Sequence, residues 1–220
     1  MRRTVMFIGM LGILVVSVAC GPLGENVTVG SGNVKTETRQ VSGFNALEFS
    51  GFGEMTIQQT GTESLSVTAE DNILPLITTT VSGQTLRIGG PSGQIIRPTR
   101  SVTYALTVKD LKALTLSGAG NITVSGIQTD ALRVVLSGAG KLTVSGTAPR
   151  QEVTLSGTGA YEAGDLTSNT ASVTVSGAGR ARVNVRDTLD ATVSGVGSIV
   201  YLGDPAVTQH VTGAGSVTKG

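Results

Sequence analysis

Apolar and polar residues alternate around a block of small residues that recurs along the second half of the chain. The block reads Ser-Gly-Ala-Gly or a close variant, and its first glycine is Gly118, Gly138, Gly157, Gly177, Gly195 and Gly213. Subtracting each of these positions from the next gives spacings of 20, 19, 20, 18 and 18, and an earlier copy surrounds Gly51. An apolar residue stands two positions before and four positions after each of these glycines. Alternation with a period of two is typical of β-strands, so the pattern predicts short strands joined at glycine corners.

The length of the repeat narrows the choice of architecture. A unit of about 18 to 20 residues is shorter than the helical repeats of about 34 residues and the propeller blades of about 40. Such a unit cannot bury an apolar face alone, but stacking at ~4.8 Å places each apolar residue above its equivalent in the neighbouring unit. We therefore expect an all-β fold, a right-handed parallel β-helix with rungs of about 18 to 20 residues. The long interval from Gly51 to Gly118 leaves room for irregular units.

The corners carry two structural expectations. We expect their serines to stack into a ladder of hydroxyl groups. The two glycines of each corner are expected where the backbone needs a positive φ, or where a β-carbon would clash with the neighbouring rung.

The N-terminal residues predict export. Arg2 and Arg3 precede an apolar run from Val5 to Val16, and small residues then lead to Cys20, the only cysteine. This order is typical of a signal peptide, and the run is shorter than the ~20 residues of a membrane-spanning helix. The segment before Cys20 resembles the bacterial lipobox, in which the cysteine is lipid-modified and becomes the mature N-terminus. A free buried thiol is the alternative for this residue.

Three segments follow from these patterns. Residues 1–19 are the expected signal peptide, residues 20–38 a lipidated N-terminus with a flexible tether, and residues 39–220 the β-helix domain. Acyl chains contribute ~0.8 kcal/mol per buried methylene group, so several of them anchor a protein to the membrane. The prediction is an exported protein of the bacterial cell envelope, lipid-anchored to the outer membrane or to the outer face of the cell membrane.

Composition and charge exclude some classes of partner. The chain has a formal net charge of +1, 3% aromatic residues and no tryptophan. It therefore lacks the basic surface that binds phosphates and the aromatic platforms on which bases stack. We expect no nucleic acid partner.

Candidate catalytic and metal-binding residues are scarce. One histidine, His210, cannot supply an ordinary transition-metal site or a Ser-His-Asp triad. In calcium-binding repeats an aspartate stands two positions after the last glycine, whereas here that position is apolar in nearly every copy. The remaining acidic residues are expected to be scattered over connecting segments, as at Asp165, Asp187, Asp190 and Asp204. The sequence predicts no catalytic residues, no cofactor and no metal site.

Threonines recur at outward positions. Thr115, Thr154, Thr174 and Thr192 are expected to form one column on the surface, with Thr123 and Thr143 in another. Regular hydroxyl arrays can bind sugars. The alternative is that threonine occurs there because β-branched residues suit exposed strands.

Several segments carry a resemblance to a known family. The chain resembles the start of the bacterial auto-transporter adhesin head GIN domain family at Gly43–Leu47, Phe49–Gly53 and Met55–Ile57. Further segments follow in the order of that family, at Asp71–Pro75, Gly83–Ile88 and Lys109–Leu111. The resemblance covers roughly residues 39 to 218. It implies a right-handed parallel β-helix on an exported or lipid-anchored protein with an adhesive role. The family has no catalytic residues to carry over.

The combined prediction is a non-enzymatic binding or adhesion module that reaches the membrane through its N-terminal lipid and binds a polysaccharide or another envelope or matrix polymer. One alternative is a structural, self-assembling protein, a homo-oligomer in which the open end at residues 210–220 pairs edge to edge with another copy. The other is a polysaccharide-active β-helix enzyme.

Overall fold

The fold is all-β, as the alternating pattern predicted. The computed structural model describes residues 27–91 and 93–220. Within these residues there are 19 strands and one short 3₁₀ helix. None of the helical structure in the described ranges is long and apolar enough to cross a membrane. In chain order the elements are β1 (Val27–Val29), β2 (Val34–Arg39), β3 (Ala46–Phe49), β4 (Phe52–Gln59), β5 (Ser64–Glu70), η1 (Leu74–Leu76), β6 (Thr78–Ser82), β7 (Thr85–Gly89), β8 (Ile95–Arg97), β9 (Thr103–Val108), β10 (Ala113–Leu116), β11 (Ala119–Gln128), β12 (Ala131–Leu136), β13 (Lys141–Thr147), β14 (Arg150–Leu155), β15 (Ala160–Val175), β16 (Arg180–Val193), β17 (Ser198–Leu202), β18 (Ala206–Val211) and β19 (Ser216–Lys219).

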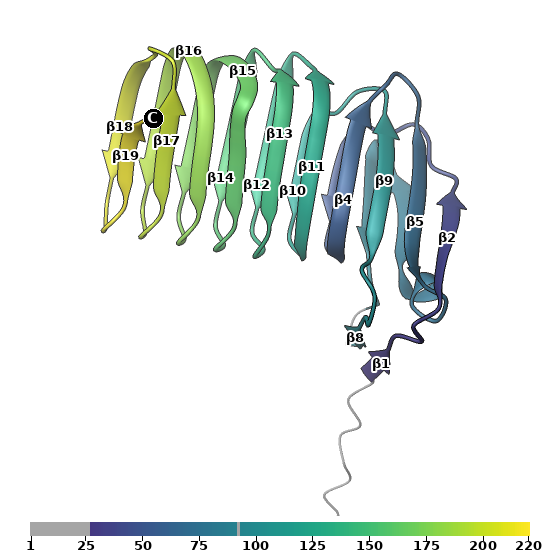
Figure 1. The fold of residues 1–220 in the computed structure, drawn as a ribbon. Coiled ribbons are helices and arrows are strands. Elements are labelled where there is room, and N and C mark those ends of the chain that lie inside the picture. The colour runs from purple at the N-terminus through teal and green to yellow at the C-terminus, as the bar shows by residue number, and fades with distance from the viewer. Residues whose placement is uncertain (1–26, 92) are drawn as a thin grey trace, which may run out of the picture.

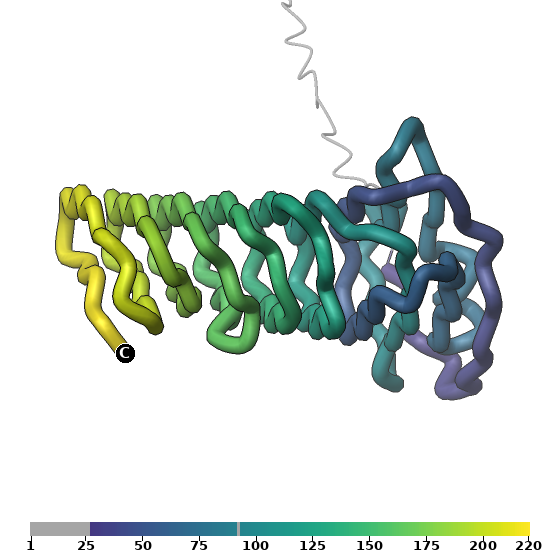
Figure 2. The backbone as a smooth tube through the Cα atoms, turned by 90° about the horizontal axis from the view of Figure 1, so that it is seen from above, coloured from purple at the N-terminus to yellow at the C-terminus, as the bar shows by residue number. Residues whose placement is uncertain are grey.

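Successive copies of the repeat lie on one another with parallel strands, and Figures 1 and 2 show the chain winding past itself in this way. We call each copy a layer; β12 with β13, for example, is one layer. The apolar position before the corner pairs from layer to layer in the order Leu116, Leu136, Leu155, Val175, Val193, Val211. The apolar position after the corner pairs in the order Ile122, Leu142, Tyr161, Ala181, Ile199, Val217. The stacking of equivalent positions is therefore confirmed.

The stacked apolar positions form a continuous core. Leu136, Leu155 and Tyr161 have no exposed surface, and the buried residues make one cluster that extends along the layers. Because side chains alternate between the two faces of a strand, the residues between these positions point outward. The core thus sets which residues every layer presents to its surroundings.

The corner glycines are required by close approach between layers. At Gly157 a β-carbon would lie 2.6 Å from the carbonyl oxygen of Ser137, and still closer to that of Gly138. Neither Gly138 nor Gly157 has a positive φ. Of the two reasons expected for these glycines, the clash with the neighbouring layer applies at both positions.

The corner serines follow one another from layer to layer, because Ser137, Ser156 and Ser176 each donate the backbone N–H to the carbonyl just before the preceding corner. The Ser176 hydroxyl donates to the Leu155 carbonyl at 3.4 Å, and the Ser50 hydroxyl donates to the Ile88 carbonyl at 3.5 Å. Among the described corners, no hydrogen bond joins two serine hydroxyls. A carbonyl of the preceding layer lies within reach of the hydroxyl, and it competes with the neighbouring serine as acceptor.

The first copy of the repeat stacks directly on the second. Strand β3 pairs with β10 on one side and with β7 on the other, and β4 pairs in the same way with β11 and β9. The irregular segment between these copies in the sequence therefore lies outside them in space. The chain returns past the first copy through residues 109–112, which connect β9 to β10.

Antiparallel strands cover this end of the core. Strand β5 pairs with β9 and with β2, and β6 pairs with β7. Leu65, Val67 and Ala69 of β5 are buried against the core. The outermost strand, β2, carries Lys35 and Glu37 and is almost entirely exposed. Charged residues on an edge strand oppose pairing with further chains.

The flexible tether expected up to residue 38 is too long. Residues 27–29 form β1, which pairs with β8, and residues 34–39 form β2. Glu70, which has no exposed surface, holds the loop between these strands. Its carboxylate accepts a hydrogen bond from the Gly32 backbone at 2.6 Å. It also accepts hydrogen bonds from the Thr99 backbone at 2.9 Å and from the Thr99 hydroxyl at 2.5 Å. Long-range contacts of this kind order a segment that has no apolar periodicity. The expected signal peptide, Cys20 and the start of the expected tether lie outside the described residues.

Acid is expected to loosen this N-terminal attachment. Burial raises the pKa of Glu70, but hydrogen bonds from Thr99, Gly32 and Arg100 outweigh burial and hold the pKa below its usual value of 4.5. A lowered folded-state pKa stabilises the fold above pH ~4.5, and this contribution is lost as the pH falls through the folded-state value. Urea unfolding midpoints should show Glu70→Gln to be less stable than the wild type at neutral pH, with the gap narrowing in acid. Parallel pH curves for the two proteins would contradict this role.

Candidate functional site

The outward threonine column is confirmed. Thr154, Thr174 and Thr192 pair directly across β14, β15 and β16, and each is half-buried. Thr115 belongs to the same column one layer beyond Val135, and His210 ends it as an exposed residue on β18. This face therefore presents hydroxyl groups at the strand spacing of ~4.8 Å.

A second outward face carries charged as well as hydroxyl groups. One of its columns runs through Thr56, Thr123, Thr143, Glu162, Arg182, Val200 and Thr218. The adjacent column contains the exposed residues Lys141 and Arg180, separated by Ala160. The expected pairing of Thr123 with Thr143 is thus confirmed, and the same column brings Glu162 and Arg182 side by side.

Strand β15 is interrupted by a bulge. Ala163 pairs with Val183, but the next pair is Thr167 with Asn184, so residues 164–166 have no partner in β16. The Asn184 side-chain amide donates to the Gly164 carbonyl at 3.1 Å and holds the bulged backbone. In Figure 2 this segment is the green loop that projects from the otherwise even row of layers. Bulges of this kind redirect side chains and are frequent beside functional sites.

A surface hollow of about 310 Å³ lies at the bulge, and we call it the bulge hollow. Its lining comes from four successive layers: Thr143, Glu162, Gly164, Asp165, Arg182 and Leu202. No ion pair among the described residues involves its three charged side chains. The hollow therefore offers carboxylate oxygens and guanidinium hydrogens that are not engaged with charged neighbours, together with one apolar side chain.

The placement of the acidic residues differs in part from the expectation. Asp165, Asp187 and Asp190 lie within the long strands β15 and β16, whereas Asp204 lies in a connecting segment as expected. Asp165 shares the bulge hollow with Glu162. Over the described ranges, no group of three or more His, Cys, Asp or Glu side chains could hold a metal ion.

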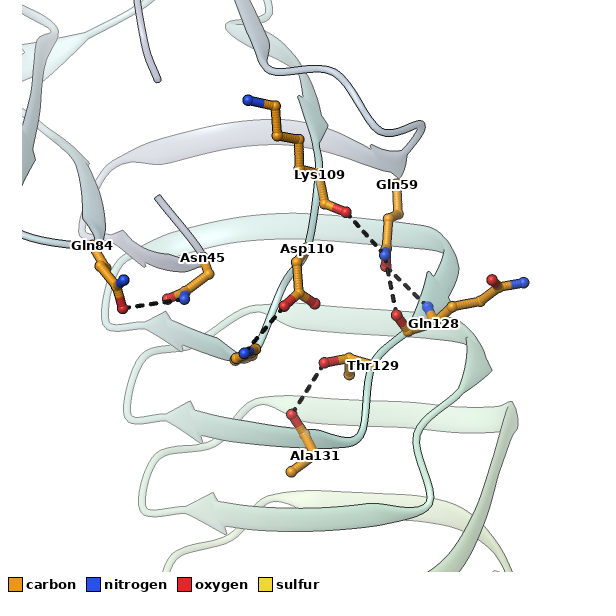
Figure 3. Close-up of polar contacts among 9 residues, drawn as sticks. Asn45, Gln59, Gln84, Lys109, Asp110, Gln128, Thr129 and Ala131 are labelled. Atoms are coloured by element: carbon orange, nitrogen blue, oxygen red, sulfur yellow. Dashed lines mark hydrogen bonds and ion pairs between the residues drawn. The ribbon is translucent and has the colours of Figure 1, made fainter. Parts of the chain in front are cut away.

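A second polar region lies where the chain passes the first copy of the repeat (Figure 3). The Gln59 side-chain amide donates to the carbonyls of Lys109 and Gln128, both at 3.1 Å, and accepts from the Gln128 backbone at 2.9 Å. Lys112 pairs with Asp110 at 3.5 Å. Glu63 also pairs with Lys109, at 3.0 Å, and its side chain is only 5% exposed. These groups are occupied in joining layers, so we assign this region a structural role.

The repeat pattern in the sequence does not bring together the residues that line the bulge hollow. The interval from Gly157 to Gly177 is longer than the two intervals that follow it, and Gly164 stands inside a strand pattern. An isolated glycine in a strand is a signal of a bulge. Neither feature, however, places Arg182 from the next layer beside the bulge.

Solved structures show which proteins this chain resembles. A putative adhesin from Bacteroides fragilis is 25% identical with a TM-score of 0.74, and the alignment covers 87% of this chain and 99% of that one. A putative lipid binding protein from Parabacteroides distasonis is 24% identical with a TM-score of 0.56, over 88% and 99% of the two chains. A putative adhesin from Parabacteroides merdae is 22% identical with a TM-score of 0.56, over 89% and 99%. The last two likenesses concern the fold alone.

A comparison with curated proteins found no match. The model of one family, described as "Putative auto-transporter adhesin, head GIN domain", matches residues 43–205. This match covers most of the chain and agrees with the resemblance seen in its motifs. The protein therefore belongs to the auto-transporter adhesin head GIN domain family.

Proposed function

We propose that this protein is an exported, lipid-anchored and non-enzymatic module of the bacterial cell envelope that adheres to a repetitive polymer such as a polysaccharide. Membership of an adhesin-type family supports this proposal, as does the likeness to a putative adhesin at 25% identity. The family and the similar structures bear the names of adhesins or binding proteins and not of enzymes.

The scaffold in this proposal is a right-handed parallel β-helix whose rungs match the repeat in length. The parallel registers between equivalent positions, from β10 through β18 and from β11 through β19, support it. Each layer contacts chiefly its neighbours in such an array, so the outward faces keep a constant spacing. A stiff array of evenly spaced groups suits a ligand that is itself repetitive.

One observation carries the functional proposal: the outward columns repeat hydroxyl and charged groups from layer to layer. A polymer that contacts several layers binds its second and later units at high effective concentration. Weak contacts at Thr154, Thr174 and Thr192 then add up along the array. No single contact needs to be strong.

A binding screen tests the proposal. The purified protein is exposed to immobilised glycans and matrix proteins, and soluble products are monitored for cleavage. We expect retention on at least one repetitive polymer without turnover. Retention on none of them would contradict the adhesion proposal, and release of shorter products would contradict its non-enzymatic part.

Binding to the polymer is expected to be distributed. Single changes such as Thr154→Ala should weaken it by less than about threefold, because each contact contributes well under 1 kcal/mol to an avid complex. Replacing Thr154, Thr174 and Thr192 together should abolish binding to this face while leaving the melting temperature nearly unchanged. Abolition by one of the single changes would exclude a distributed surface.

Lipid attachment is expected at Cys20, because the apolar run ends there and small residues precede it. Metabolic labelling with a fatty-acid analogue should mark the wild type in a bacterial host and should not mark Cys20→Ala. Equal labelling of the two proteins would exclude lipidation at this residue. The same fractions should show the wild type with the membrane and the variant released from it.

Self-assembly is a second candidate function, favoured by the state of the last layer. Val211 of β18 is 40% exposed, and in the described chain no strand pairs with the outer edges of β18 and β19. The opposite end is covered by β2, β5 and β6 (Figure 1). Sedimentation over a wide range of protein concentration distinguishes the two functions. A single monomeric species at all concentrations would exclude assembly, whereas a concentration-dependent increase in mass would favour it.

A further inference from the structure

We infer that the bulge hollow is the primary glycan subsite of the protein, a discrete site for a short, neutral, hydroxyl-rich segment of a polysaccharide. This inference rests on the adhesion proposal and locates its strongest contact. The columns on either side then extend the contact along the polymer.

The first argument is the bulge itself. Regular pairing of β15 with β16 would keep the backbone hydrogen bonds intact, as it does between β12 and β14 and between β16 and β17, whereas β11 and β13 have a register shift of their own. Instead, residues 164–166 leave the register with β16, while Asp165 and Leu166 still pair with β13, and the Asn184 amide donates to the bulged Gly164 carbonyl. An irregularity that is stabilised by its own side-chain hydrogen bond positions the side chains beside it.

The second argument is the chemistry of the lining. Arg182 lies directly across from Glu162 in the register, and Asp165 completes the group. A carboxylate accepts and a guanidinium donates two parallel hydrogen bonds, a geometry that matches the adjacent hydroxyl groups of a sugar ring. Leu202 supplies an apolar contact for the C–H groups of such a ring. Both kinds of contact are thus present in one hollow.

The third argument is charge. The two carboxylates and Arg182 leave the hollow with one negative charge, and the exposed cations Lys141 and Arg180 lie in the adjacent column. The fields of these groups oppose one another, so neither a strongly acidic nor a strongly basic polymer is favoured. A neutral glycan meets hydrogen-bonding groups of both kinds without a penalty for like charge.

The size of the hollow agrees with this ligand. Its lining spans four layers, which at ~4.8 Å per layer gives a length of about 14 Å. Its volume of about 310 Å³ lies at the lower end of the range for small-molecule sites. About two sugar units fit these dimensions.

Nuclear magnetic resonance with disaccharides tests the inference. Isotope-labelled full-length protein is titrated with cellobiose, maltose and N,N′-diacetylchitobiose as neutral probes. We expect at least one of them to shift the amide signals of Gly164, Asp165 and Arg182 in a saturable manner. Absence of saturable shifts at these amides with all three probes would overturn the inference.

Matched variants separate the hollow from the surrounding face. Arg182→Ala and Asp165→Asn should each weaken disaccharide binding by about tenfold, the loss expected for a charge-assisted hydrogen bond. Arg186→Ala and Asp187→Asn change exposed residues of β16 outside the hollow, and they should bind within about twofold of the wild type. Equal losses in both pairs would overturn the assignment. All four positions are exposed, and the amide spectra verify that each variant is folded.

The two proposals fail separately in these experiments. If a polymer binds but the disaccharides leave the hollow unshifted, the adhesion proposal stands and this subsite is excluded. If no polymer binds while a disaccharide saturates the hollow, the subsite stands and polymer adhesion is excluded.

Discussion

Gly157→Val should lower the free energy of unfolding by about 3 kcal/mol or more, because the new side chain would overlap backbone atoms that cannot move aside without breaking other contacts. The new β-carbon would meet the carbonyl oxygens of Gly138 and Ser137, which belong to the preceding layer. The clash can be removed only if the two layers move apart at the corner. This movement breaks the contacts between the apolar residues before the corner and between those after it. Denaturant titration measures the loss.

The matched control lies three residues away. Thr154→Ala changes an outward, half-buried side chain of the same layer and should cost about 0.5 kcal/mol or less, as surface substitutions do. A threonine change that costs as much as the glycine change would show that the corner does not determine how the layers stack.

Tyr161→Ala is expected to lower the free energy of unfolding by about 3 to 5 kcal/mol, as the removal of other buried aromatic rings does. Tyr161 has no exposed surface and lies in the core between Leu142 and Ala181. Its hydroxyl donates to the side-chain oxygen of the buried Gln151 at 3.3 Å, and the Gln151 amide donates to the Ser168 hydroxyl at 2.7 Å. Burial raises the pKa of Tyr161, so the hydroxyl keeps its proton for this bond.

Tyr161→Phe separates the hydroxyl from the ring. This variant retains the ring and leaves the Gln151 oxygen without its donor, so it should cost about 1 to 3 kcal/mol. Calorimetric or urea unfolding of both variants gives the two values. If the phenylalanine variant loses as much stability as the alanine variant, the ring contributes little and the assignment of the core to stacked apolar positions is wrong at this layer.

The repeat allowed much of the regular part of the fold to be predicted. Stacking requires that equivalent residues meet, so the partners of Leu136, Leu155 and Thr174 followed from spacing alone. The glycine corners were also predictable, since small residues at a fixed period indicate a close approach of backbones. Both expectations depend only on neighbouring layers, and neighbouring layers are close in sequence.

The irregular part could not be predicted in the same way. The position of β3 between β7 and β10 depends on β7, which belongs to no copy of the repeat. The order of residues 27–38 depends on the pairing of β1 with β8 and of β2 with β5, and on the hydrogen bond from Gly32 to Glu70. These contacts join residues that are far apart in the sequence. The hydrogen-bond partner of a corner hydroxyl also depends on local geometry, since a carbonyl of the preceding layer accepts the Ser176 hydroxyl.

The candidate site combines a predictable and an unpredictable part. The outward columns followed from alternation, but the bulge hollow requires the extra residues of β15 to lie against Arg182 of β16. The spacing of 20 before Gly177 is longer than the two that follow, but it equals the spacing before Gly138, and it does not indicate to which side added residues project. A surface hollow formed by several layers becomes visible only once their relative positions are known.

The dependence of affinity on ligand length tests the central claim most directly. Fragments of increasing length, prepared from a polymer that the protein retains, are titrated by calorimetry. If evenly spaced layers bind a repetitive polymer, affinity should rise with each added unit until the fragment reaches about 29 Å, the span of six layer spacings at ~4.8 Å, and should then level off. Equal affinity for the shortest and the longest fragments would contradict a distributed surface.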